Sequence, residues 1–255
     1  YNQLLYLMGR HLYAQASFSQ AIDVFQEVDP NSAQYSYAKF FEGISFIRMR
    51  QARPAIASFR SILEAIDAGN VDGVDEGRMR NLAWISLARV HYPPSNPSKG
   101  GQIDGTLLGQ SVESWTKVEQ ASEYWLDSLF ESSWALFLAD EYSRALGNVH
   151  TLYSPYFEDS FYPEALVLKA VTFFVNCQVD NAEATVAQYH DRYDPVKQEL
   201  DAVLQKHQDN ADFVEFLKKV ADLNPQLNDT QFADYHCHGW NFRAVQKRDL
   251  QGNLI

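Results

Sequence analysis

The sequence lacks an apolar run long enough to cross a membrane, and it is poor in basic residues and in cysteine. Its 255 residues contain 33 acidic and 21 basic side chains, a formal net charge of −12. Nucleic acids and anionic membrane surfaces attract basic proteins, so this charge argues against both as main partners. Two cysteines are too few for a disulfide framework. This net charge is compatible with a partner protein that has a basic surface.

Recognisable processing signals and catalytic motifs are missing as well. The first residues, Tyr1-Asn2-Gln3, show neither an initiating methionine nor a signal peptide, so the chain reads as a fragment or a mature form. There is no nucleophile elbow, phosphate-binding loop, paired-carboxylate motif or dinucleotide fingerprint. We expect a protein that is not an enzyme, needs no cofactor and does not insert into a membrane. Because 46% of its residues are hydrophobic, it has ample material for a core.

What the sequence does contain is a pattern that repeats after 34 residues. A small residue stands twelve positions before an alanine, and a large apolar residue stands four positions after that alanine. Such a pattern predicts two antiparallel helices, with the small residue at their close crossing and the aromatic ring beside it. The first two units carry Gly9, Ala21 and Phe25, then Gly43, Ala55 and Phe59.

Three further units follow this pattern with substitutions. They carry Ala88, Ser111 and Trp115, then Ser133, Ala145 and Val149, then Ala170, Ala182 and Val186. In the first of these three, the turn is eleven residues longer, and its prolines and glycines exclude a helix. This loop, at about residues 92–106, is a candidate recognition element with Pro93 to Gly105 as a second contact to a partner.

The repeated pattern resembles the tetratricopeptide repeat (TPR) family over residues 1–195. The resemblance implies an all-α, right-handed TPR solenoid of about five helical hairpins. Residues 196–223 keep the helical period without the signature, and we expect them to form a C-terminal helical cap. Residues 224–255 are rich in aromatic side chains, and we expect them to pack on the solenoid or on a partner.

Residues 124–195 are similar to TPR proteins of bacterial cell-envelope machines, including those of gliding-motility complexes. The similarity lies in residues 145–152 and in Tyr162-Pro163-Glu164-Ala165. It implies a periplasmic location, although a cytoplasmic one stays open. The expected function is a non-catalytic scaffold for protein–protein interaction within an envelope assembly.

In the TPR family the first helix of each hairpin lines a concave groove. Offsets of −6, −3, +1 and +4 from the small crossing residue share one helical stripe, and the resemblance assigns that stripe to the groove. Lys and Asn residues that grip a peptide carboxylate in some TPR domains are missing from it. We therefore expect an apolar or amphipathic segment of another protein to bind there, with Arg10, Arg48 and Arg89 pairing its acidic groups. The candidate partner-binding residues are Tyr6, Arg10, Tyr13, Tyr37, Phe40, Ile44, Arg48, Arg89, Tyr92, Phe130, Trp134 and Phe137. In the fifth unit the offsets fall on Glu164, Val167, Val171 and Phe174.

Several alternatives stay open at this point. The stripe could simply be buried, either by tight winding or by the C-terminal residues. The chain could be a self-assembling structural subunit in which a second copy fills the groove or an end face. Residues 234–240, with His236-Cys237-His238, could form a metal- or ligand-binding module, although local packing is the better explanation and we expect no metal site. For Cys177 we expect a buried position, and a bond to Cys237 is the alternative in an oxidising compartment.

Overall fold

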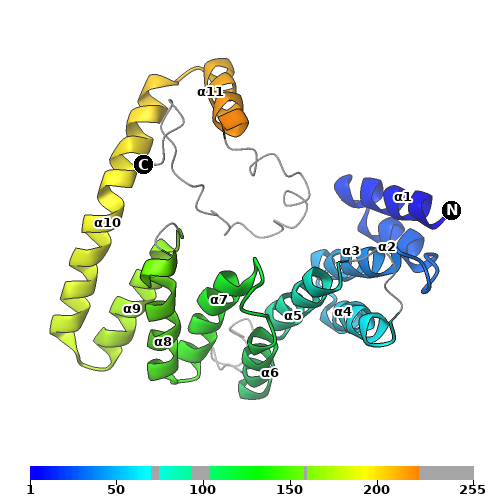
Figure 1. The fold of residues 1–255 in the computed structure, drawn as a ribbon, viewed down its shortest axis with the longest axis horizontal. Coiled ribbons are helices and arrows are strands. Elements are labelled where there is room, and N and C mark those ends of the chain that lie inside the picture. The colour runs from blue at the N-terminus through cyan, green and yellow to red at the C-terminus, as the bar shows by residue number, and fades with distance from the viewer. Residues whose placement is uncertain (70–74, 93–103, 158–159, 224–255) are drawn as a thin grey trace. The chain divides into compact units, whose positions relative to one another are not determined.

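All the regular structure in the described part of the chain is helical. The computed structural model describes residues 1–69, 75–92, 104–157 and 160–223. The chain divides into two compact units, Tyr1–Glu141 and Tyr142–Ile255 (Figure 1). Among the described helices, none combines the length and the apolar character that a bilayer crossing requires.

The first unit is a succession of helical hairpins. The helices of each hairpin pack against each other, and the second helix also packs against the first helix of the next hairpin. Every helix between the first and the last of this unit thus packs on both of its neighbours in sequence order. Its helices are α1 (Asn2–Ala14), α2 (Phe18–Gln26), α3 (Tyr35–Arg48), α4 (Ala52–Asp67), α5 (Glu76–His91), α6 (Gly105–Thr116) and α7 (Trp125–Leu138).

The second unit contains one complete hairpin, formed by α9 and α10, and a helix, α8, that packs on α9. Its helices are α8 (Tyr142–Leu152), a 3-10 turn (Pro155–Phe157), α9 (Pro163–Val175), α10 (Val179–Lys206) and α11 (Asn210–Leu223). The fourth predicted hairpin, which consists of α7 and α8, falls across the boundary between the two units.

The glycines at the predicted helix crossings have the role that the repeat assigned to them. A Cβ atom built on Gly9 would lie 2.3 Å from Cε1 of Phe25, and one on Gly43 would lie 2.5 Å from Cε1 of Phe59. Both phenylalanine rings are fully buried. A side chain larger than hydrogen therefore cannot fit at either crossing without moving an enclosed ring.

Two hydrogen bonds confirm that the hairpin with the long turn is the same unit as the first hairpin. Asn2 Oδ1 accepts a hydrogen bond from the backbone N–H of Asp29, 27 residues later, at 3.2 Å. Asn81 Oδ1 accepts one from the N–H of Glu119, 38 residues later, at 2.9 Å. The two separations differ by eleven residues, the length by which the turn is extended. In both of these hairpins, the first helix thus holds the linker that follows the second helix.

Four of the hairpin turns share one backbone motif. Ala16, Arg50, Asp140 and Cys177 adopt φ between +57° and +60°, just after the first helix of a hairpin. At Arg50, the N–H of Arg50 donates to the carbonyl of Ile47, and the next N–H, of Gln51, donates to that of Phe46. The same pair of bonds recurs at the other three turns. This is the Schellman motif that usually ends helices with glycine. The expectation of a buried Cys177 is wrong, because the residue occupies this surface turn and is exposed.

Replacing Arg50 with glycine is expected to stabilise the protein by about 0.5–1 kcal/mol. Glycine removes the clash that a Cβ atom causes at positive φ, and this gain exceeds the extra freedom of glycine in the unfolded chain. The change is measured by urea unfolding. Arg60→Gly, in the middle of α4, is the matched control and should destabilise by about 1 kcal/mol. Equal effects of both variants would contradict the role of the turn.

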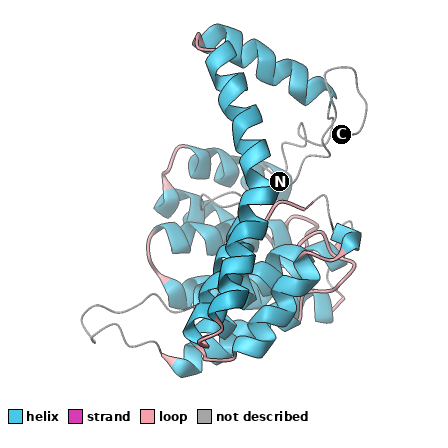
Figure 2. Cartoon of the chain, turned by 90° about the vertical axis from the view of Figure 1, so that its left-hand side faces the viewer, coloured by secondary structure: helices cyan, strands magenta, loops and turns pink. Residues whose placement is uncertain are grey.

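The resemblance to the TPR family ends at residue 195, but no helix ends there. Helix α10 continues through Pro195 to Lys206, so the predicted capping pair is the end of α10 followed by α11 (Figure 2). Pro195 is exposed and so is Asp191, whose carbonyl the proline leaves without its helical donor, so water can solvate that group. No described side chain of α11 is buried, and Leu200, Leu204, Val214 and Leu217 are exposed. The capping role of these helices, and the packing of residues 224–255 outside the described ranges, stay predictions.

Candidate functional site

Three of the predicted binding residues form an aromatic cluster in the first unit. Tyr6 and Tyr13 from α1 lie against Phe41 of α3, with ring centroids 6.1 Å and 5.5 Å away, and Tyr37 lies 6.1 Å from Tyr6. The three tyrosines are half-buried, whereas Phe41 is buried beneath them. We call Tyr6, Tyr13, Tyr37 and Phe41 the N-terminal aromatic cluster. In this cluster, three partly exposed tyrosine rings lie around a buried phenylalanine.

Two predicted arginines stack on aromatic rings of this region. The guanidinium carbon of Arg10 lies 5.3 Å from the centroid of Phe41, and that of Arg48 lies 5.6 Å from the centroid of Phe18. Cation–π contacts of this kind orient the charged group. The expected pairing of Arg10 and Arg48 with acidic groups of a partner stays a prediction.

Arg89 differs, because an acidic group of the same chain binds it. Its Nε lies 2.9 Å from one carboxylate oxygen of Glu131, and its Nη2 binds the other oxygen in a two-point contact. Trp115 also donates its indole N–H to Glu131, at 3.3 Å. Arg89 therefore stabilises the contact between α5 and α7, and the prediction that it pairs with a partner is corrected by this internal ion pair. The contacts of Glu131 with Arg89 and with Trp115 were not predicted. The spacing of these residues in the sequence does not indicate them.

Phe40 and Ile44 belong to the core of the first unit. Their side chains are only 4% and 7% exposed, and the ring of Phe40 packs 6.0 Å from that of Phe59. Leu82 and Ile85, at two of the same offsets in the third hairpin, are buried too. In these two hairpins the neighbouring helices close over the stripe. Phe40 and Ile44 are therefore corrected from binding residues to core residues.

The remaining predicted residues are half-buried. Phe130, Trp134 and Phe137 follow one another along α7, and the rings of Trp134 and Phe137 lie 6.3 Å apart. Tyr92 ends α5 with its ring 5.9 Å from Trp115, and burial raises the pKa of its hydroxyl. Part of the surface of each of these side chains is therefore accessible.

The most open part of the stripe is on α9. Val167, Val171 and Phe174 are 44%, 39% and 66% exposed, and their spacing of four and three residues puts them on one face of the helix. We call these three residues the α9 stripe. Glu164 precedes them at the start of the helix, and partial burial raises the pKa of its carboxyl. The offset rule groups these residues on one face of the helix, and their assignment to a groove stays a prediction.

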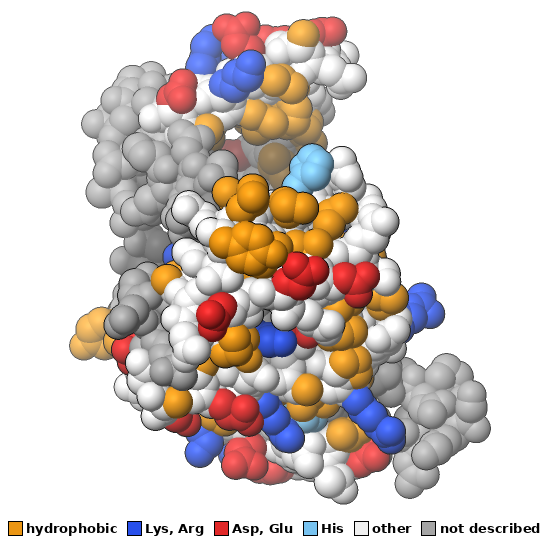
Figure 3. Space-filling model, turned by 90° about the vertical axis from the view of Figure 1, so that its right-hand side faces the viewer, with side chains coloured by type: hydrophobic (Ala, Val, Ile, Leu, Met, Phe, Trp, Pro, Cys, Tyr) orange, Lys and Arg blue, Asp and Glu red, His pale blue; other side chains and the backbone are white. Residues whose placement is uncertain are grey.

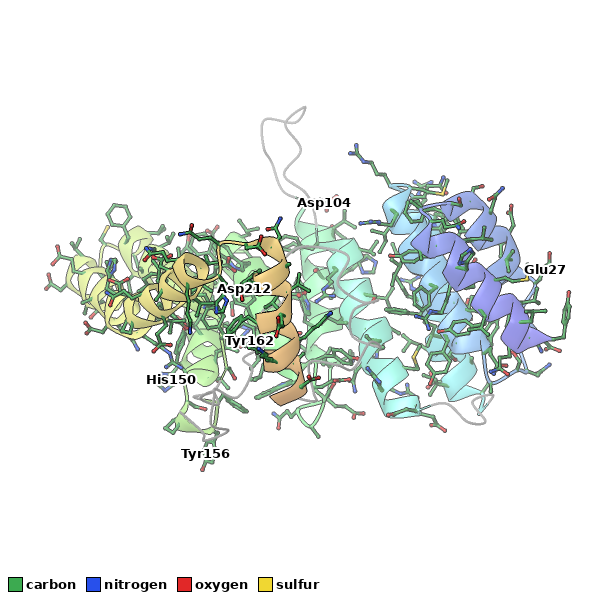
Figure 4. All side chains as sticks on the ribbon, turned by 90° about the horizontal axis from the view of Figure 1, so that it is seen from above. Glu27, Asp104, His150, Tyr156, Tyr162 and Asp212 are labelled. Atoms are coloured by element: carbon green, nitrogen blue, oxygen red, sulfur yellow. The ribbon has the colours of Figure 1, made fainter. Side chains whose placement is uncertain are left out.

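The tyrosines of the second unit form a structural cluster. The hydroxyl of Tyr153 lies 2.9 Å from that of Tyr193 and donates a hydrogen bond to the carbonyl of Tyr162 at 2.7 Å. Burial, followed by the hydrogen bond with Tyr193, raises the pKa of Tyr153 far above its ordinary value. Arg192 lies over the ring of Tyr153 at 5.0 Å. This cluster attaches the segment that connects α8 and α9 to helix α10. Tyr156, in the same segment, points away from the helices (Figure 4).

The other predicted elements lie largely outside the described residues. These are the loop of residues 93–103 and the segment with His236, Cys237 and His238. Where the chain is described again, Asp104 begins α6 (Figure 4) and accepts hydrogen bonds from the N–H groups of Thr106 and Leu107. Within the described residues, no group of three or more His, Cys, Asp or Glu side chains is arranged to hold a metal ion.

Comparison with known proteins identifies the fold. No family model matches the sequence, and no curated protein matches it. Among solved structures, the MamA protein is similar with a TM-score of 0.58 and 11% identity, over 77% of this chain and 94% of that one. TTC0263, described as a thermophilic TPR protein in Thermus thermophilus, gives a TM-score of 0.43 and 16% identity, over 79% of this chain and 96% of that one. PilF of Pseudomonas aeruginosa gives 0.35 and 16% over the same shares. With its repeated hairpins of 34 residues and its crossing glycines, this chain has the all-α fold of the tetratricopeptide repeat proteins.

Proposed function

We propose that this protein is a non-catalytic scaffold that binds an apolar or amphipathic segment of a partner protein on the groove-facing side of its first helices. The observation that carries the proposal is the exposure of the α9 stripe. Three large apolar side chains, including Phe174 at 66% exposure, share one face of a helix that buries Ala165, Leu168 and Thr172 on its other sides. Apolar side chains aligned in this way favour an interface with another protein.

The geometry favours a helical or extended apolar segment over a polar ligand. The α9 stripe contains no charged side chain, and its half-buried neighbour Glu164 lies at one end. An amphipathic helix with anchors spaced by three and four residues would match this pattern, and Phe174 would be its main aromatic contact. In the first unit, the N-terminal aromatic cluster supplies contacts of the same character.

A scaffold role also suits the charged groups of the first unit, which are used for structure. Glu42 is buried and accepts hydrogen bonds from Gln26 at 3.1 Å and from Lys39 at 2.6 Å. Arg89 and Glu131 bind each other, as described above. We assign these groups to the packing of successive hairpins and none of them to catalysis.

The test begins with a photo-crosslinking amino acid at position 174 of the full chain, exposed to an extract of the source cells. The expected result is a specific crosslinked protein, which is then purified and titrated against the chain. The double variant Val171→Asp/Phe174→Asp should weaken its binding by at least about 30-fold, since loss of a hot spot costs about 2 kcal/mol or more.

Leu107 of α6 is the matched control, because it is an exposed apolar residue outside the stripe. A crosslinker at position 107 should not capture the same protein, and Leu107→Asp should leave its affinity unchanged. Equal capture from both positions, or unchanged affinity of the double variant, would contradict the proposal.

A periplasmic location within a cell-envelope assembly is a separate part of the proposal. It is supported by the resemblance of residues 145–152 and 162–165 to TPR proteins of envelope machines. Fractionation of the source cells tests it. Recovery of the protein with cytoplasmic markers alone would contradict the location without affecting the scaffold role.

A further inference from the structure

The outer face of α1 is apolar and exposed. Leu4, Leu7 and Met8 are 59%, 51% and 46% exposed, and Tyr1 continues the same face. Hydrophobic side chains gather on the side of the molecule that Figure 3 shows. Leu4 and Leu7 stand five and two positions before the crossing residue Gly9.

In the second and fifth hairpins, these two positions are buried, and a helix of the preceding hairpin packs on them. They are Ala38 and Phe41 in α3, and Ala165 and Leu168 in α9, all of them fully or nearly fully buried. Helix α2 packs on α3, and helix α8 packs on α9. At the first of these junctions Phe25 stacks on Phe41 with ring centroids 6.0 Å apart. The exposed face of α1 thus carries apolar residues at the repeat positions that a preceding hairpin covers in α3 and α9. Among the described residues, no second helix covers this face of α1.

The last hairpin presents the other half of the same junction. Val186 of α10 stands four residues after Ala182, the position that Phe25, Phe59, Trp115 and Val149 occupy in earlier hairpins. Those four side chains are buried, whereas Val186 is 47% exposed. Helix α10 is therefore a second helix without a following first helix among the described residues.

The two faces are complementary in polarity and in charge. At the internal junction between α2 and α3, Gln26 donates a hydrogen bond to Glu42. On the two exposed faces, Ala187 of α10 occupies the repeat position of Gln26, and Met8 of α1 occupies that of Glu42, so both positions are apolar. Helix α1 has no acidic residue and carries Arg10, while α10 carries exposed Asp180 and Glu183 near Val186. Opposite charges at the rim of an apolar contact favour one orientation over others.

We propose that copies of this chain stack head to tail, with the α1 face of one copy packed on the α10 face of the next. The contact continues the hairpin-to-hairpin junction that the chain makes internally, with a second copy as the occupant. Because the two faces differ, the contact is heterologous, and it builds open chains of copies unless the rotation closes a ring. It is independent of the α9 stripe.

Leu7→Glu and Val186→Glu test this arrangement in sedimentation equilibrium over a wide concentration range. The wild-type mass should rise with concentration above the 29.1 kDa of one chain. Each variant alone should remain at that mass, because a buried glutamate would oppose the contact. An equimolar mixture of the two variants should form dimers and nothing larger, because each variant keeps one intact face.

Several outcomes would overturn the proposal. They are a wild-type protein that stays monomeric, association that persists in either variant, and a mixture that fails to form dimers. Suppression by Leu7→Glu alone would instead identify a two-fold contact between α1 helices. Leu107→Glu is the matched control and should associate like the wild type. Circular dichroism verifies folding, and Leu4→Glu or Ala187→Glu replaces any variant that unfolds.

Discussion

Replacing Gly43 with alanine is expected to destabilise the protein by about 2–3 kcal/mol. The new Cβ atom would lie 2.5 Å from Cε1 and 2.7 Å from Cζ of Phe59, well inside contact distance. Phe59 is fully buried, so its ring has no free space to move into, and α3 must separate from α4. Overpacking a rigid core costs about 1–3 kcal/mol as a rule, and here the clash involves a ring rather than a flexible chain end. Urea unfolding monitored by circular dichroism measures the loss.

Gly109 provides the matched control for this substitution. It lies in α6 of the same unit, and a Cβ atom built on it has no neighbour within 4 Å. Gly109→Ala should therefore stabilise the protein by up to about 1 kcal/mol, the difference in helix propensity. Shortening the opposing ring should relieve the clash, so the double variant Gly43→Ala/Phe59→Leu should lose less stability than the sum of its single variants. A neutral Gly43→Ala variant would contradict the tight crossing.

The sequence was sufficient to predict the hairpins because their crossing residues obey a strict spacing. The separation of 34 residues locates Gly9 and Gly43, and the close approach of the helices requires a small residue there for steric reasons alone. The third hairpin could be recognised in the sequence despite its long turn, because the insertion lies between the two helices. The structure agrees, since Asn81 still binds the linker that follows the hairpin. The steric rules of helix packing were therefore enough to predict the fold.

The errors in the predicted site arise from contacts that no local pattern encodes. Helical offsets identify which face of a helix Phe40 and Ile44 occupy, but their burial depends on how closely the neighbouring hairpins approach. The ion pair of Arg89 joins it to Glu131, 42 residues away. The resemblance to the TPR family ends at Pro195, yet a proline on an exposed face breaks only one bond of a long helix, and α10 continues.

Replacing Phe41 with alanine is expected to cost about 3–5 kcal/mol and to disturb the N-terminal aromatic cluster. The ring of Phe41 contacts those of Tyr6, Tyr13, Phe25 and Phe40, with centroids 5.5–6.1 Å away. It is nearly fully buried at the junction of the first two hairpins, so its removal leaves a cavity that these rigid rings cannot fill. Tyr6 and Tyr13 would lose the surface on which they rest, which near-ultraviolet circular dichroism detects. Urea unfolding gives the free energy.

Leu7→Ala is the matched control, because Leu7 occupies in α1 the position that Phe41 occupies in α3. Leu7 is 51% exposed, so its truncation should change the stability of the isolated chain by no more than about 0.5 kcal/mol. Both variants must be compared at a concentration low enough to exclude association, since a contact at Leu7 would add to the measured stability. If Leu7→Ala becomes costly only as the concentration rises, the α1 face is a junction surface completed by a second copy. A large cost at every concentration would place Leu7 in the core of the single chain and contradict its exposure.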